Sequence, residues 1–251
     1  MASTNRYVSA FERLNLERNP VGVKFLALKP DGIERIKKRV ALCEMFYEAQ
    51  EKGSFYVQKE DFLCVEPLVL GMVDPEPVFQ SGLAGGEAGL YKEVRANRKV
   101  YQYIPKMLKG SVNYVAFASI DRLTFDPDVL IITANVDQAR TILRAEGYSS
   151  GDMWSAKGTP IIACAWIYVY PVISGKINYT ITGLHLGMRA INAPIPQGLF
   201  LISVPWNLLP TVLENLQDEG MYKEWQSSGR EEHYKKFNEH CAELRQKMPN
   251  Y

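Results

Sequence analysis

Short runs of β-favouring residues dominate the chain from Asn113 onwards and constrain its fold more than any other feature. The runs, in order, are VNYVAFASI, DVLIITA, IIACAWIYVYPVI, NYTITGL and LFLISVP. Between the second and the third, NVDQARTILRAEGYSS places its apolar residues on one helical face behind an Asn135 or Asp137 cap. These segments predict a strand–helix–strand unit, with parallel pairing between its two strands across the crossover.

The N-terminal part alternates between helix and strand patterns. Residues 3–18 have near-helical apolar spacing, and VGVKFL alternates as a half-buried strand does, with Lys24 opposite its apolar face. Residues 31–52 begin at an Asp cap and carry one apolar stripe. That stripe predicts an amphipathic helix in which Cys43 faces inward.

Further along, residues 55–57 favour a short strand, the Gly- and Pro-rich stretch up to residue 89 predicts a loop, and a helix is expected from about Leu90. LLPTVLENLQDEG and EEHYKKFNEHCAELRQKM predict terminal helices, the second highly charged. We therefore predict an α/β fold, with α+β as its variant, in which a mixed β-sheet is flanked by helices. Residues 1–251 are expected to form one domain with tail helices at about 207–248, and a split near residue 110 is the alternative.

Composition excludes some partners. Lysine plus arginine (29) nearly balance aspartate plus glutamate (28), so no basic field is present to hold a nucleic acid or an anionic membrane. No segment has the apolar length of a signal peptide core or of a membrane-spanning helix. We therefore expect a cytoplasmic protein that does not associate with a membrane. Cysteines stay reduced there, so Cys43, Cys64, Cys164 and Cys241 are expected to be free thiols or metal ligands.

Several catalytic patterns are absent from the sequence. GLAGGEAGL matches neither the P-loop spacing nor the dinucleotide-binding spacing, and the chain contains no Gly-x-Ser-x-Gly and no His-Glu-x-x-His. Two of the three histidines, His233 and His240, lie in the charged last helix, where a solvated surface position is expected. A serine or cysteine hydrolase would therefore need His185 as its base, and nothing in the sequence places Cys164 beside it.

The thiols suggest metal binding instead. Cys43 lies on a predicted helix, Cys64 lies at the start of another, and Cys164 interrupts an apolar run. None of them forms a C-x-x-C pair, so tertiary folding would have to assemble a site. Three thiolates and one imidazole would satisfy zinc or an iron–sulfur cluster, because soft sulfur ligands select such centres. Four unrelated packing or surface thiols remain the alternative.

A family resemblance bears on this choice. The segments that carry it are NPVGVKFL, ALCEMFYEAQEKGSFYVQKEDFLCVEPLVLGM, DPDVLIITANVDQARTILRA, the stretch around Cys164, and LHLGMRAINAPIPQGLFLISVPWNLLPTVLENL. In this order they resemble the prokaryotic family called domain of unknown function 169, over about residues 19–216. Each motif is loose, and their order is the stronger part of the match. The resemblance itself implies no activity.

The resemblance implies a set of four cysteines. Family members carry a Cys in the first helix, one in a Glu-Asp-x-x-Cys step, one after the β–α–β segment and one in a Cys-x-Gly-x-Arg step. Cys43, Cys64 and Cys164 match the first three, and His185 stands at the fourth, followed by Gly187 and Arg189. Histidine commonly replaces cysteine among metal ligands, so the resemblance favours a ligand role for His185. A satisfied core or surface histidine is the alternative.

Basic and aromatic residues form a second set of candidates. Tyr91, Arg95, Asn97, Arg98, Tyr101 and Tyr103 form a band that could line a pocket or an interface, or could be a solvated helix face. Lys24 and Arg189 could bind an anion or form structural salt bridges. A pocket for a small molecule would combine Lys24, Arg95, Tyr101 and Arg189.

These observations lead to one functional hypothesis and two alternatives. The first is a [4Fe–4S] cluster held by Cys43, Cys64, Cys164 and His185, which serves redox chemistry or electron delivery to a partner protein. The second is a protein that binds a small molecule or an organic cofactor and whose cysteines are structural. The third is a structural zinc protein with the same four ligands. A homo-oligomer is compatible with all three.

Overall fold

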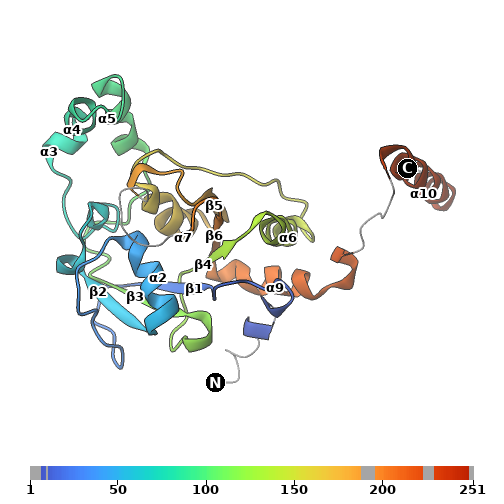
Figure 1. Ribbon diagram of the computed structural model, residues 1–251, viewed down its shortest axis with the longest axis horizontal. Coiled ribbons are helices and arrows are strands. Elements are labelled where there is room, and N and C mark those ends of the chain that lie inside the picture. Colours follow the sequence, from blue (N-terminus) through green and yellow to red (C-terminus); the bar gives the residue numbers. More distant parts are fainter. Residues whose placement is uncertain (1–6, 10, 188–195, 223–228, 249–251) are drawn as a thin grey trace.

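A single six-stranded sheet organises the chain (Figure 1). The computed structural model describes residues 7–9, 11–187, 196–222 and 229–248. The strands are β1 (Val21–Leu26), β2 (Phe55–Gln58), β3 (Tyr114–Ser119), β4 (Val129–Ala134), β5 (Asn178–Ile181) and β6 (Phe200–Pro205). Their order is β2-β3-β1-β4-β6-β5, and all five pairings are antiparallel. Strands from both sides of residue 110 therefore share one sheet.

Helices cover both faces of this sheet. The longer ones are α2 (Leu42–Lys52), α5 (Val94–Tyr103), α6 (Val136–Gly147), α9 (Leu209–Gln217) and α10 (Arg230–Lys247), and the shorter ones are α3 (Pro77–Gln80), α4 (Leu83–Glu87) and α7 (Tyr170–Ser174). Short 3-10 turns occur at Lys59–Asp61 and Glu66–Leu68, among others. The predicted α/β class, one sheet flanked by helices with a C-terminal helix, is confirmed.

The two faces of the sheet bury separate hydrophobic clusters. Every residue of β4 is buried, and Val129 and Ile131 point into the cluster that contains α2 and residues 161–169. Leu130 and Ile132 point the other way, into the cluster under α6 and α9. This alternation follows from the period of two along a strand. Because both sides are buried, residues 129–132 of β4 are all apolar.

The predicted strand at IIACAWIYVYPVI is wrong. Ala165–Val169 form a π-helical turn that leads directly into α7, and β4 pairs with β1 and β6 instead of with a parallel partner. The run is apolar on all sides, so its periodicity does not distinguish a buried strand from a buried helix. Pro171 is tolerated because the preceding turn is π-helical, and the Trp166 carbonyl five residues earlier accepts from Asn178 Nδ2 at 2.8 Å instead.

The predicted helix over residues 31–52 is correct only in its second half. α2 begins at Leu42, and the preceding segment forms isolated parallel bridges, Arg35 with Tyr56 and Val40 with Phe62. The Glu44 carboxylate accepts a hydrogen bond of 2.7 Å from the Ala41 backbone N–H and so marks the true helix start. Tertiary pairing outweighs the local helical spacing here. In contrast, the predicted Asn135 cap of α6 is confirmed, because its side chain accepts from Gln138 N at 2.9 Å.

The glycines of GLAGGEAGL serve helix packing. The stretch predicted as a loop contains α3 and α4, and α5 begins at Val94, slightly later than expected. A Cβ atom on Gly85 would lie 2.2 Å from Nδ2 of the buried Asn97 on α5, so only glycine allows this contact between α4 and α5.

Candidate metal centre

Two short segments that run side by side bring Cys43 and Cys64 together. The Val40 N–H donates to the Asp61 carbonyl at 3.0 Å, and the Leu63 N–H donates to the Val40 carbonyl at 3.1 Å. Two residues further on, the Leu42 N–H donates to Cys64 Sγ at 3.3 Å. Cys43, the second residue of α2, therefore lies next to the segment that carries Cys64.

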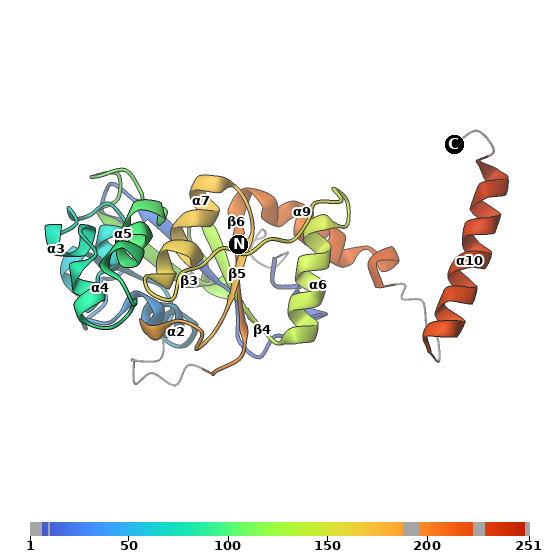
Figure 2. The ribbon, with the colours of Figure 1, turned by 90° about the horizontal axis from the view of Figure 1, so that it is seen from above.

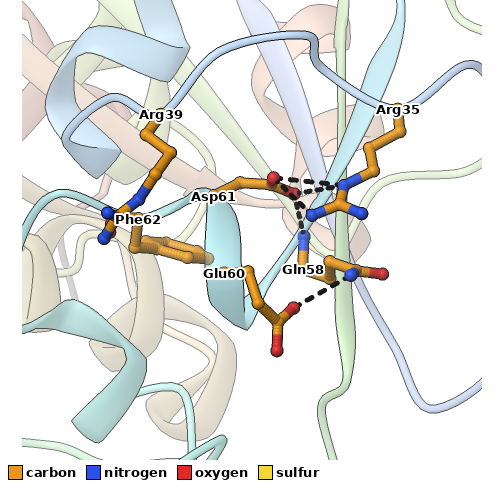
Figure 3. A network of polar contacts seen from close by, with 6 residues as sticks. All are labelled: Arg35, Arg39, Gln58, Glu60, Asp61 and Phe62. Carbon is orange, nitrogen blue, oxygen red and sulfur yellow. Dashed lines mark hydrogen bonds and ion pairs between the residues drawn. The ribbon is translucent and has the colours of Figure 1, made fainter.

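Ionic and polar contacts fix this pairing (Figure 3). The Arg35 guanidinium donates to both carboxylate oxygens of the buried Asp61, at 2.7 to 3.1 Å, and the Gln58 N–H donates to the same carboxylate at 2.9 Å. Arg39 donates to the Phe62 carbonyl at 2.9 Å. Because these bonds join residues 35–39 to residues 58–62, they set the register that places the two cysteines together.

Cys164 approaches from a third segment. Its side chain is buried and lies beside that of Cys43, with Cys64 among its electrostatic neighbours. Tyr168, one helical turn later, donates from its hydroxyl to the Leu42 carbonyl at 3.2 Å and so ties this helix to the start of α2. The structure thus places Cys164 beside Cys43, with Cys64 close enough to act on it electrostatically, so three of the four predicted ligands lie in one region of the molecule.

The surroundings of Cys64 and Cys164 keep these two thiols neutral. The neighbouring Cys43 side chain, together with burial, raises the pKa of Cys164 well above its ordinary value. Burial, assisted by the Glu66 carboxylate, strongly raises the pKa of Cys64. Several anionic sulfurs cannot share such a space without a compensating cation, because each negative charge disfavours the next. The Cys64 and Cys164 thiols are therefore protonated unless a metal replaces their protons.

Glu66 is a ligand-type residue at this cluster that the sequence interpretation missed. Its Oε2 atom is buried and has no hydrogen-bond partner among the described residues, and neither has the hydroxyl of Tyr47. The Glu66 carboxylate also acts on the pKa values of both Cys64 and Cys164. Burial raises the pKa of Tyr47 to about 12, so this group is a neutral phenol. The Cys-x-Glu spacing of residues 64–66 was the available signal.

His185 has different neighbours. Its Nδ1 lies 2.6 Å from the Thr159 carbonyl, which can only accept, so Nδ1 carries the proton. Its Nε2, 2.7 Å from Thr180 Oγ1, then accepts from that hydroxyl. Burial lowers the pKa of His185, which keeps the ring neutral. Both ring nitrogens are engaged, so the predicted ligand role of His185 would require one of these bonds to be exchanged.

A cavity adjoins His185. It has a volume of about 400 Å³ and is lined by residues 156–160, residues 179–181, Leu184 and His185. Buried Asn178 holds one wall, because its side chain accepts from the Lys157 N–H at 2.8 Å and donates to the Lys157 carbonyl at 3.0 Å. The cavity is therefore bounded by a fixed backbone.

Among the described residues, those predicted to form a small-molecule pocket contact different parts of the protein. Lys24 donates to the Asp126 carbonyl at 2.5 Å, and exposed Arg95 forms an ion pair of 2.5 Å with Glu93. Tyr101 is buried against Phe79, with ring centroids 6.1 Å apart. In the part of the chain that the structure describes, no hydrogen bond, ion pair or ring contact joins any two of these three. The remaining candidate, Arg189, falls outside the described residues.

The cluster is not organised as a finished coordination site. Within residues 7–9, 11–187, 196–222 and 229–248, no group of three or more His, Cys, Asp or Glu side chains could hold a metal ion as it stands. Binding would thus require the thiols to deprotonate and turn toward a common point. In addition, none of the described helices combines the length and the apolar character needed to cross a bilayer.

Comparison with known proteins identifies the family. The profile of domain of unknown function 169, described as an uncharacterised ArCR family, matches residues 11–215. Neither the curated proteins nor the solved structures contain a match. The family match covers more than half of the chain and agrees with the order of motifs in the sequence. The chain therefore belongs to the family of domain of unknown function 169.

Proposed function

We propose that the protein binds an iron–sulfur cluster at Cys43, Cys64 and Cys164 and serves redox chemistry or electron delivery. The observation that carries this proposal is the proximity of three thiols: Cys164 lies beside Cys43, which is 121 residues earlier in the sequence, and Cys64 is among the electrostatic neighbours of Cys164. The Leu42 N–H bond to Cys64 Sγ supports it, because such donors stabilise the sulfur ligands of clusters and tune their potential.

The chemistry of the donor set fits such a group. Soft thiolates select iron–sulfur clusters or zinc over hard cations, and a bound cation would compensate the charges that raise the thiol pKa values here. When bound, a cluster supplies one-electron transfer. The protein's part is to hold the sulfurs, to donate from Leu42, and to exclude water through the surrounding core.

For the fourth ligand we favour Glu66 over His185. The Glu66 Oε2 atom is buried beside the thiols without a hydrogen-bond partner among the described residues, whereas both His185 nitrogens are already bonded. An unpaired buried carboxylate oxygen is costly, and ligation would remove that cost. Carboxylates are accepted ligands of zinc as well, so this choice does not depend on the metal.

Metal and sulfide analysis tests the proposal. We expect anaerobically purified protein to be brown, with about four iron and four sulfide per chain when every site is filled. If the protein contains zinc and no sulfide, the same thiols form a structural zinc site and not a cluster site. Colourless protein without metal, prepared with iron and sulfide present, would contradict both.

Paired variants test the fourth ligand. In Glu66→Gln we expect the iron and sulfide content to fall at least about tenfold, because the amide is a poor ligand. His185→Gln should keep its full content, and Glu60→Gln, at an exposed glutamate directly before Asp61, serves as the matched control. Full content in Glu66→Gln with loss in His185→Gln would return the fourth position to the histidine.

The cavity beside His185 favours a second candidate function, the binding of a small organic molecule. Its volume of about 400 Å³ lies within the range of ligand pockets, and it offers apolar walls and the polar pair of Thr180 and His185. Native mass spectrometry should then detect a retained organic ligand without inorganic sulfide. Leu184→Trp would fill the cavity and abolish retention, whereas Leu28→Trp, at another exposed position, would not.

A further inference from the structure

The last helix carries a regular apolar stripe. Tyr234, Phe237, Cys241 and Leu244 on α10, followed by Met248, are separated by three, four, three and four residues. This is the heptad spacing that brings apolar side chains to one seam between two packed helices. The large side chains of the stripe are exposed to solvent: Tyr234 by 56%, Phe237 by 46%, Leu244 by 41% and Met248 by 48%.

α10 remains largely exposed to solvent. None of its residues is buried, and in both views it lies away from the sheet (Figure 2). An isolated helix of 18 residues is marginal in water, because helices in proteins are held mainly by packing of an apolar face. The family match ends at residue 215, so α10 lies outside the matched region. We propose that the stripe of α10 packs antiparallel against the same stripe of a second copy of this chain.

Side-chain volumes favour the antiparallel arrangement. When two antiparallel helices cross at residue 239 of each copy, Tyr234 faces Leu244 of the second copy. Phe237 then faces Cys241 of the second copy. Each layer then combines an aromatic residue with a smaller one, which fills the seam evenly. A parallel pair would instead place Phe237 against Phe237 and Cys241 against Cys241, leaving alternate crowded and empty layers.

Charges favour the same arrangement. Glu231 and Arg245 occupy equivalent heptad positions beside the stripe, 14 residues apart. In an antiparallel pair, equivalent flanking positions meet across the seam, so each Glu231 lies near an Arg245 of the second copy, and the pair forms twice. The helix dipoles also oppose each other favourably. The seam follows about 27 Å of helix, so the interface is small and we expect a dimer of micromolar affinity.

Sedimentation velocity on the full chain, from low micromolar to several hundred micromolar, tests the dimer. We expect a monomer–dimer equilibrium, and Leu244→Glu should raise the dissociation constant at least about tenfold by placing a charge in the seam. Leu108→Glu, at an 82% exposed position outside α10, is the matched control and should leave the constant unchanged. A wild-type chain that stays monomeric throughout would overturn the proposal, whatever other partner α10 then binds.

Disulfide cross-linking tests the direction of the helices. A chain carrying Phe237→Cys and Cys241→Ser, mixed with the wild-type chain under a mild thiol oxidant, should form mixed dimers in excess over either homodimer. The antiparallel layers predict this result, because residue 237 faces residue 241 of the other copy. Preferential cross-linking of wild-type Cys241 to itself would contradict the antiparallel register. Circular dichroism melts of each variant check that the fold of the main body is unchanged.

Discussion

Cys164→Ala is expected to abolish cluster binding while the fold persists. Cys164 is buried between Cys43 and the neighbouring core, so its loss removes a sulfur that no other described cysteine can replace. Alanine is similar in size and apolar, and a substitution of this kind in a core costs roughly 1 kcal/mol. Iron and sulfide per chain should fall by at least about tenfold in anaerobic preparations.

Cys241→Ala is the matched control for this variant. Cys241 lies on α10, whose residues are not part of the thiol cluster, so its replacement should leave iron and sulfide at the wild-type level. Thermal melts should show both variants folded. Equal cluster content in Cys164→Ala and wild type would remove Cys164 from the site and would leave two thiols, which is too few to support the proposal.

Asp61→Ala is expected to lower both the stability of the protein and its cluster content. The buried Asp61 carboxylate accepts from Arg35 and from the Gln58 N–H, and removing it leaves these donors without their acceptor. Loss of a hydrogen bond to a charged group costs about 2 kcal/mol, which corresponds to a Tm decrease of about 5 °C in a chain of this size. Because Asp61 sets the register of residues 61–64, Cys64 should also move away from Cys43.

Asp31→Ala controls for the loss of a carboxylate. Asp31 is exposed near the start of the same segment, so its replacement should change neither Tm nor iron content. If Asp61→Ala lowers Tm but keeps its full cluster content, the Arg35–Asp61 contact is structural only and does not position the cysteines.

Sequence periodicity correctly predicted several helices and strands whose burial does not change along their length. DVLIITA and LFLISVP are strands as predicted, and the Asn135-capped helix lies where its stripe and cap indicated. The prediction failed at residues 161–170, where a run that is apolar on every side carries no periodic signal. It also failed before Leu42, where a helical spacing is overridden by pairing with residues 56 and 62.

The candidate centre was only partly accessible from the sequence. Residue type and the family resemblance singled out Cys43, Cys64 and Cys164, but their meeting depends on isolated parallel bridges, which leave no periodic pattern in the sequence. Glu66 was missed because a lone glutamate after Cys64 resembles any surface carboxylate until its burial is known. The ligand role of His185, which rests on the family resemblance, remains a prediction.

The bridge between Arg35 and Tyr56 has a consequence for solubility. β2 is an edge strand of the sheet. The outward backbone groups of Tyr56 are paired: its N–H donates to the Glu34 carbonyl, and its carbonyl accepts from the Ile36 N–H, both at 2.9 Å. An open border strand invites pairing with another molecule and hence aggregation. Residues 34–36 thus act as a shield for the sheet. A change that releases this shield should produce aggregates before it unfolds the core.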